Sequence, residues 1–215
     1  INAAEAVLVL MVASRTVGVE MTGVLTISFT VANLMMCIGK YGVRNFQVTD
    51  VKNEFTFTEY YSARWVTLCF MIFASFAYVG YAYVANGYTL EKIVIVLSVV
   101  FIYAIEAYED VFLSGLQHIN RLDIGTKMFS LRWMITLMTW CVGLVVLRNA
   151  FYSTIFAAAI NFALVIVLTR IVRSTIEEKE FLKDKRNSKR ILVMCLPLCV
   201  SSFTAIYLPN AAKYA

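Results

Sequence analysis

The chain has 215 residues, of which 60% are hydrophobic and 15% are charged, and its formal net charge is +5. Soluble domains contain about 45–50% apolar and about 25% charged residues. This composition, with a mean hydropathy of +0.74, therefore excludes an ordinary soluble domain. The sequence indicates an integral membrane protein.

Seven apolar stretches are long enough, or nearly so, to cross a membrane as helices, which takes roughly 20 residues. In chain order they cover residues 1–13, 21–38, 65–85, 93–115, 129–147, 151–171 and 191–208. Helices are expected because lipid cannot satisfy backbone polar groups. Short polar connectors separate the stretches, so neighbours should run antiparallel. The sequence thus predicts an all-α fold, a polytopic transmembrane helix bundle.

Both ends of the sequence lie close to apolar runs. The chain opens without Met inside the first run, which is short, and closes soon after the seventh. We expect a fragment of a longer polytopic protein. The charged segment 172–190 forms a natural boundary between an N-terminal transmembrane lobe, residues 1–171, and a first helix of a second lobe, residues 191–215.

The positive charges predict the orientation, because cytoplasmic connectors carry an excess of Lys and Arg. Of the 19 Lys and Arg residues, 15 fall in or beside the connectors 40–64, 116–132 and 172–190. We therefore expect these three connectors to be cytoplasmic. The basic balance is a signal of topology, and no aromatic-interleaved basic motif points to nucleic acid.

Two of these connectors have features of their own. Residues 40–64 mix aromatic and charged residues, and a short amphipathic helix near Phe55–Tyr61 is expected to lie on the membrane surface. Residues 172–190 are expected to form a charged helix or hinge.

Three acids interrupt the apolar stretch 93–115. As a helix, the stretch would place Glu106, Glu109 and Asp110 at positions i, i+3 and i+4, on one face. Glu109 and Asp110 are expected at the membrane interface. Glu106 lies deeper, and a buried ionisable group within a span indicates function; Arg64 and Arg132 are its candidate partners. Whether Glu106 faces a wet cavity stays open.

Arg15 ends the first apolar stretch, within the segment SRTVG. It can be read as an arginine that extends to the outer interface. Alternatively, it lies in a central cavity and contacts an anionic substrate, since a guanidinium binds phosphate through paired hydrogen bonds. The residues alone do not decide between these readings.

Enzymatic chemistry finds no support in the sequence. There is no G-x-S-x-G or H-E-x-x-H segment and no Asp-rich metal motif, and the single His has no evident Ser or Cys partner. The five cysteines suggest neither a disulfide framework nor a zinc site. We expect a protein that is not an enzyme and uses no cofactor.

Three segments in register resemble one family. These are SRTVG after the first span, IGKYGVRNFQVTDVKNEFTFTEYYSARW after the second, and EAYEDVFLSGLQHINRLDIGTK leaving the fourth, with its R-L-D-x-G-x-K run. Together they resemble the polysaccharide flippases of the multidrug/oligosaccharidyl-lipid/polysaccharide (MOP) exporter superfamily, across essentially the whole chain.

The resemblance implies twelve or more helices in two six-helix lobes, of which this chain would hold the first six and the seventh. It implies flipping of undecaprenyl-pyrophosphate-linked oligosaccharide across the bacterial plasma membrane by alternating access, in concert with polysaccharide polymerase and ligase machinery. The matching positions are Arg15, for a cationic cavity, and Arg44. Together with the residues above, the candidate substrate-binding set is Arg15, Arg44, Arg64, Glu106 and Arg132.

The acids at residues 106, 109 and 110 depart from what an anionic substrate favours. They could pair with arginines or couple transport to H⁺ or Na⁺. The acids thus keep open a cation-coupled multidrug exporter of the same superfamily. Two further alternatives are a seven-span receptor or scaffold and a membrane-embedded polymerase or glycosyltransferase.

Overall fold

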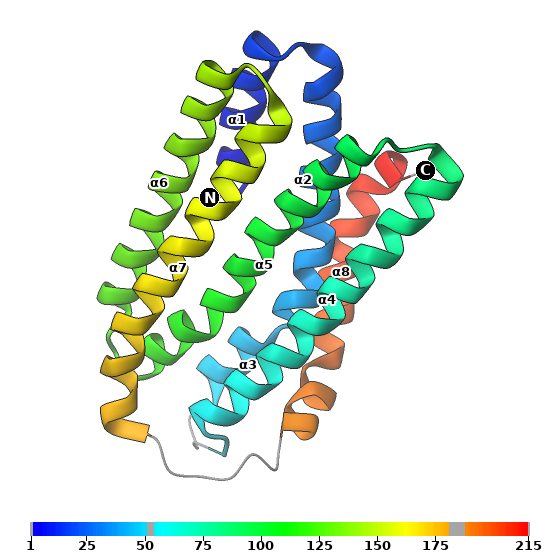
Figure 1. Cartoon of the computed structure of the whole chain (residues 1–215). Coiled ribbons are helices and arrows are strands. Elements are labelled where there is room, and N and C mark those ends of the chain that lie inside the picture. The colour runs from blue at the N-terminus through cyan, green and yellow to red at the C-terminus, as the bar shows by residue number, and fades with distance from the viewer. Residues whose placement is uncertain (1, 51–53, 181–187, 215) are drawn as a thin grey trace.

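A computed structural model describes residues 2–50, 54–180 and 188–214, and these residues form helices joined by short turns, with no strand (Figure 1). The predicted all-α class is confirmed. In chain order the helices are α1 (Asn2–Thr16), α2 (Val19–Lys40), α3 (Val43–Thr49), α4 (Phe57–Asn86), α5 (Leu90–His118), α6 (Leu122–Leu147), α7 (Ala150–Glu180) and α8 (Ser188–Tyr214).

Five segments of the described chain are long and apolar enough to cross a membrane. They are Val19–Thr49, Phe57–Ala85, Leu122–Leu147, Ala150–Arg173 and Lys189–Leu208. A bundle with several such helices is a membrane protein. The helix α5 is absent from this set because charged residues interrupt its apolar sequence.

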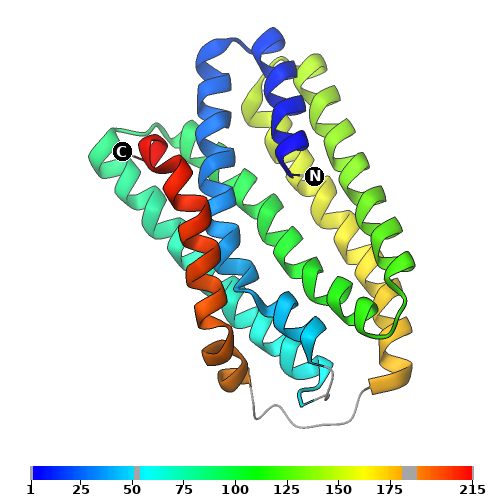
Figure 2. The same cartoon turned by 180° about the vertical axis from the view of Figure 1, so that it is seen from behind.

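The helix α5 lies at the centre of the bundle. It contacts α2, α3, α4, α6 and α7, and most of its residues between Ile95 and Leu116 are buried. Figure 1 shows α4 and α7 on either side of it, and Figure 2 shows α1 and α8 on the opposite face of the molecule. Glu106, Glu109 and Asp110 of α5 are therefore enclosed by protein.

The chain reverses direction between successive long helices. The α2–α3 turn, the α5–α6 turn and the facing ends of α7 and α8 lie at one end of the bundle, which we call the α3 end. The turns α1–α2, α4–α5 and α6–α7 lie at the opposite end. The described parts of all three connectors that the sequence predicts to be cytoplasmic are thus at the α3 end.

Local sequence explains two of the boundaries. At the start of α4, Thr56 and Glu59 form a capping box in which the Glu59 carboxylate accepts a 2.8 Å hydrogen bond from the Thr56 backbone N–H. Between α2 and α3, Tyr41 and Gly42 both have positive φ angles, 49° and 71°. This left-handed pair ends α2 and redirects the chain into α3.

The structure corrects two expectations about the connectors. No separate surface helix lies near Phe55–Tyr61; the short helix is α3, and residues 57–61 form the first turns of α4. The connector expected at 116–132 is almost entirely helical, because α5 continues to His118 and α6 begins at Leu122. Membrane helices continue beyond their apolar segments wherever protein contacts support the extra turns, and a hydropathy boundary misses these turns.

The last helix packs on the first part of the bundle. α8 contacts α2, α3 and α4, and a Cβ on Gly42 would lie only 2.7 Å from the Cβ of Leu198. Of the connector expected at 172–190, residues 181–187 lie outside the described residues, while α7 reaches Glu180 and α8 starts at Ser188. The division into two lobes stays a prediction.

Candidate functional site

Three acids in the second half of α5 are buried inside the bundle. Glu106, Glu109 and Asp110 are 8%, 7% and 6% exposed. The side chains of Glu109 and Asp110 face other helices, and their expected depth at the membrane interface stays a prediction. The three also diverge, since Glu106 and Asp110 point toward α2, α3 and α4 while Glu109 points toward α6.

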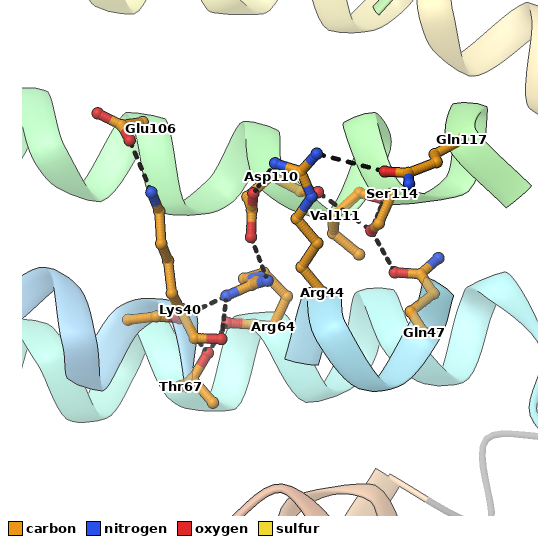
Figure 3. A network of polar contacts seen from close by, with 11 residues as sticks. Lys40, Arg44, Gln47, Arg64, Thr67, Glu106, Asp110, Val111, Ser114 and Gln117 are labelled. Atoms are coloured by element: carbon orange, nitrogen blue, oxygen red, sulfur yellow. Dashed lines mark hydrogen bonds and ion pairs between the residues drawn. The ribbon is translucent and has the colours of Figure 1, made fainter. Parts of the chain in front are cut away.

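Glu106 pairs with a lysine from the end of α2. The Lys40 ammonium donates a 2.7 Å hydrogen bond to the Glu106 carboxylate, and Figure 3 shows the lysine reaching across from α2 to α5. Lys40 was not among the candidate partners expected from sequence, which were Arg64 and Arg132. Glu106 is buried against this lysine, with its side chain 10% exposed.

Asp110 receives two arginines. The Arg44 and Arg64 guanidinium groups each donate to a different Asp110 oxygen, both at 3.2 Å. Arg44, from α3, also donates to the Gln117 side chain at 3.3 Å. Asp110 therefore joins α3 and α4 to the central helix (Figure 3).

Arg64 is completely buried and caps the C-terminal end of α2. Its guanidinium donates to the carbonyl oxygens of Gly39 and Lys40 at 2.6 and 2.9 Å. Carbonyls in the last turn of a helix have no partner within the helix, so they accept a cation readily. The Thr67 hydroxyl donates to the Gly39 carbonyl as well, at 2.8 Å. Arg64 is thus a structural cation, without a surface to offer a substrate.

Arg132 forms a second buried cluster on the other side of α5. It donates to Glu109 at 2.7 Å and to the Asn161 side-chain oxygen of α7 at 2.6 Å. The Thr136 hydroxyl also donates to that oxygen, at 3.3 Å. The cluster links α5, α6 and α7, and Arg132 is enclosed like Arg64.

Arg15 stands apart from the other four candidates. It is exposed in the last turn of α1, at the end of the bundle opposite α3. Within the described part of the chain no ion pair or hydrogen bond joins its side chain to another residue. The sequence-derived set is thus divided between two ends of the molecule.

A hollow of about 260 Å³ opens beside the first cluster. Its walls come from the end of α2, from α3, α5 and α8, and include Lys40, Arg44, Asp110 and Ser202. The side chains of Lys40 and Arg44 are 33% and 35% exposed, whereas Arg64 is fully buried. These two cations can be reached from the hollow, and Lys40 is one that sequence reasoning did not select.

A further acid, Glu5, is buried between α1 and α6. It is 3% exposed and accepts a 3.3 Å hydrogen bond from the Trp133 indole N–H. Its position adds a further carboxylate to the interior, where four cations already face Glu106, Glu109 and Asp110. Among the described residues, no group of His, Cys, Asp and Glu is arranged to hold a metal ion.

The fold and the charged clusters define a polytopic helical membrane protein with ion pairs at its core. In comparisons with known proteins, no family model, curated protein or solved structure matches the chain.

Proposed function

We propose that the chain belongs to a membrane transporter that flips undecaprenyl-pyrophosphate-linked oligosaccharide from the cytoplasmic to the outer face of the bacterial plasma membrane. It would do so by alternating access, as a step in cell-surface polysaccharide synthesis, and deliver its product to polymerase and ligase machinery. The proposal rests on the motif resemblance together with the placement of charge in the bundle.

The observation that carries the proposal is the accessibility of Lys40 and Arg44. Both lie at the α3 end and line the hollow between the first helices and α8. A pyrophosphate is strongly anionic, and guanidinium and ammonium groups bind it through charge-assisted hydrogen bonds. We assign the first contact with the head group to these two residues.

The remaining candidates take different roles in this proposal. Arg64 and Arg132 hold helices together and do not meet the substrate. Arg15, exposed at the opposite end, would attract the head group on the side where the lipid is released. In this proposal Glu106 and Asp110 have a role as well. They pair with Lys40 and Arg44 and so partly neutralise these two cations when the hollow is empty.

The test replaces Lys40→Gln and Arg44→Gln, singly and together, in the complete gene. In cells that lack the native gene, lipid-linked oligosaccharide retained on the cytoplasmic face and polymer at the surface are quantified at matched protein levels. Arg121→Gln is the control, because Arg121 is an exposed arginine at the same end, 55% exposed at its side chain. We expect the double variant to retain lipid-linked oligosaccharide and the control to export it. Normal export by the double variant would refute the assignment.

A cation-coupled multidrug exporter is the second candidate, favoured by the buried acids Glu5 and Glu106. Efflux of cationic dyes separates the two functions. The exporter hypothesis requires Glu106→Gln to abolish dye efflux while Arg15→Ala and the Lys40 and Arg44 variants leave it unchanged. The flippase proposal requires instead that oligosaccharide export depends on Arg15, Lys40 and Arg44 and that Glu106→Gln has no effect on dye efflux. Coupling to H⁺ or Na⁺ is measured separately.

A further inference from the structure

A long apolar groove runs along α5 on the face of the bundle away from α8. Its walls are α4 and α7, which flank α5 in Figure 1. It encloses about 390 Å³, within the size range of small-molecule sites, roughly 300–1,000 Å³. Side chains from all three helices line it, among them Leu68, Ile72, Phe101, Ile105, Phe162 and Val165.

The groove is open toward the surroundings of the bundle. Ile72 is 45% exposed, Phe101 42% and Phe162 47%. In a membrane protein such a surface meets lipid chains, and a concave one holds a chain in contact on three sides. Dispersion contacts accumulate with the number of atoms in contact, so the groove favours a retained chain over a freely exchanging one.

Two arginines line the same groove at its α3 end. Arg170 and Arg173 lie one turn apart on α7, and both are exposed. The apolar sequence of α7 gives way to the charged run RSTIEEKE from Arg173 on, which puts the two guanidinium groups at the level of the lipid head groups. A second hollow, of about 380 Å³, shares Trp65, Phe112 and Arg173 with the groove and extends it toward the start of α4.

The lining of both hollows combines apolar and aromatic side chains with these two cations, and the residues that form it include no Asp or Glu. An occupant that matches this pattern has a long apolar chain and an anionic head at one end. Guanidinium groups bind phosphate oxygens in pairs, and the cytoplasmic leaflet supplies anionic lipid.

We propose that the groove between α4, α5 and α7 binds one anionic glycerophospholipid, with an acyl chain against α5 and the phosphate between Arg170 and Arg173. This site is distinct from the proposed transport route, because it lies on the face opposite α8 (Figures 1 and 2). The bound lipid bridges α4 and α7 and so stabilises the arrangement of both around the central helix.

The test uses the complete protein, purified in detergent and titrated with phosphatidylglycerol or phosphatidylcholine of identical acyl chains. Bound lipid is counted by native mass spectrometry, and the midpoint of thermal unfolding is recorded in parallel. We expect phosphatidylglycerol to bind more tightly and to raise the midpoint. The variant Arg170→Gln with Arg173→Gln should lose about tenfold or more in affinity. Arg148→Gln, an exposed arginine at the other end of the bundle, should bind as the wild type does.

Further arms identify the occupant. Phosphatidylglycerol with six-carbon chains should bind much more weakly, because the groove would be left unfilled. Equal affinity for both head groups, or unchanged affinity in the double variant, would overturn the proposal. Inorganic pyrophosphate binding as tightly as the lipid would mark a plain anion site, and stronger competition by undecaprenyl pyrophosphate would assign the groove to the transported lipid. Loss of this site leaves the export test at Lys40 and Arg44 unaffected, so the two proposals fail separately.

Discussion

Arg132 of α6 and Glu109 of α5 form an ion pair of 2.7 Å that is shielded from solvent, with side-chain exposures of 3% and 10%. The pair joins two helices at the centre of the bundle. Removing one member leaves the other charge buried without compensation, which typically costs about 3–5 kcal/mol.

We therefore expect Arg132→Met or Glu109→Leu alone to lower the free energy of unfolding by about 3–5 kcal/mol. The double variant should recover a large part of this loss, because it removes both buried charges. Thermal unfolding in detergent measures all three. The matched control is the exposed pair of Arg121 and Asp123, 3.7 Å apart, whose removal should cost about 1 kcal/mol or less. If the double variant lost as much free energy of unfolding as the two single variants together, this account would be contradicted.

Arg64→Lys should destabilise the protein although it conserves charge. The guanidinium donates hydrogen bonds to the carbonyls of Gly39 and Lys40 and to the Asp110 carboxylate. An ammonium group cannot reach three acceptors in that planar arrangement. At least one buried acceptor would lose its donor, at about 1–3 kcal/mol. Unfolding of Arg64→Lys is compared with that of the exposed Arg121→Lys, for which no change is expected. Equal stability of the two variants would rule out the role assigned to Arg64.

Gly42→Ala should disturb the packing of α8. Gly42 has a φ of 71°, and an added Cβ would lie 2.7 Å from the Cβ of Leu198. Strain and collision act together here, so the midpoint of unfolding should fall by several degrees, at about 2–4 °C for each kcal/mol in a chain of this size. Gly23→Ala is the control: it lies within α2 with nothing within 4 Å of an added Cβ. It should be neutral or slightly stabilising, and a matching loss in both variants would exclude a specific contact with α8.

Arg15 gives a prediction about function. Arg15→Ala should reduce export strongly while Arg15→Lys restores part of it, because the exposed position calls for a positive charge and has no partner within the described structure that requires a guanidinium. Protein levels in the membrane provide the control, and little change is expected for an exposed residue. Full export by Arg15→Ala would remove this residue from the route.

Much of the fold was predictable from hydropathy. The apolar stretches at 21–38, 65–85, 129–147, 151–171 and 191–208 each lie within a helix of the structure. Lipid cannot satisfy backbone polar groups, and a long apolar helix pairs them within itself. Helix ends were less predictable. α5 continues to His118 and α4 begins at Phe57, since contacts with neighbouring helices, which sequence spacing does not reveal, support those extra turns.

The candidate site was predictable only in part. The chain spacing of Glu106, Glu109 and Asp110 identified a charged helix, but not that each acid has its own cation. Lys40 was taken for a topology signal, although it reaches Glu106 from the last turn of α2. The pairing depends on which helices neighbour α5. A short helix was expected near Phe55–Tyr61, whereas α3, which carries Arg44, covers Val43–Thr49. Periodicity along one helix holds no information about its neighbours.

The most direct test is lipid flipping by the complete protein in reconstituted vesicles. A fluorescent undecaprenyl-pyrophosphate-linked sugar is placed in both leaflets, and the fraction reached by a membrane-impermeant quencher is followed over time. Wild-type protein should raise this fraction well above protein-free vesicles, and the variant with both Lys40→Gln and Arg44→Gln should not, while Arg121→Gln behaves as the wild type. Equal quenching with and without the wild-type protein, or full activity in the double variant, would contradict a route through the hollow at Lys40 and Arg44.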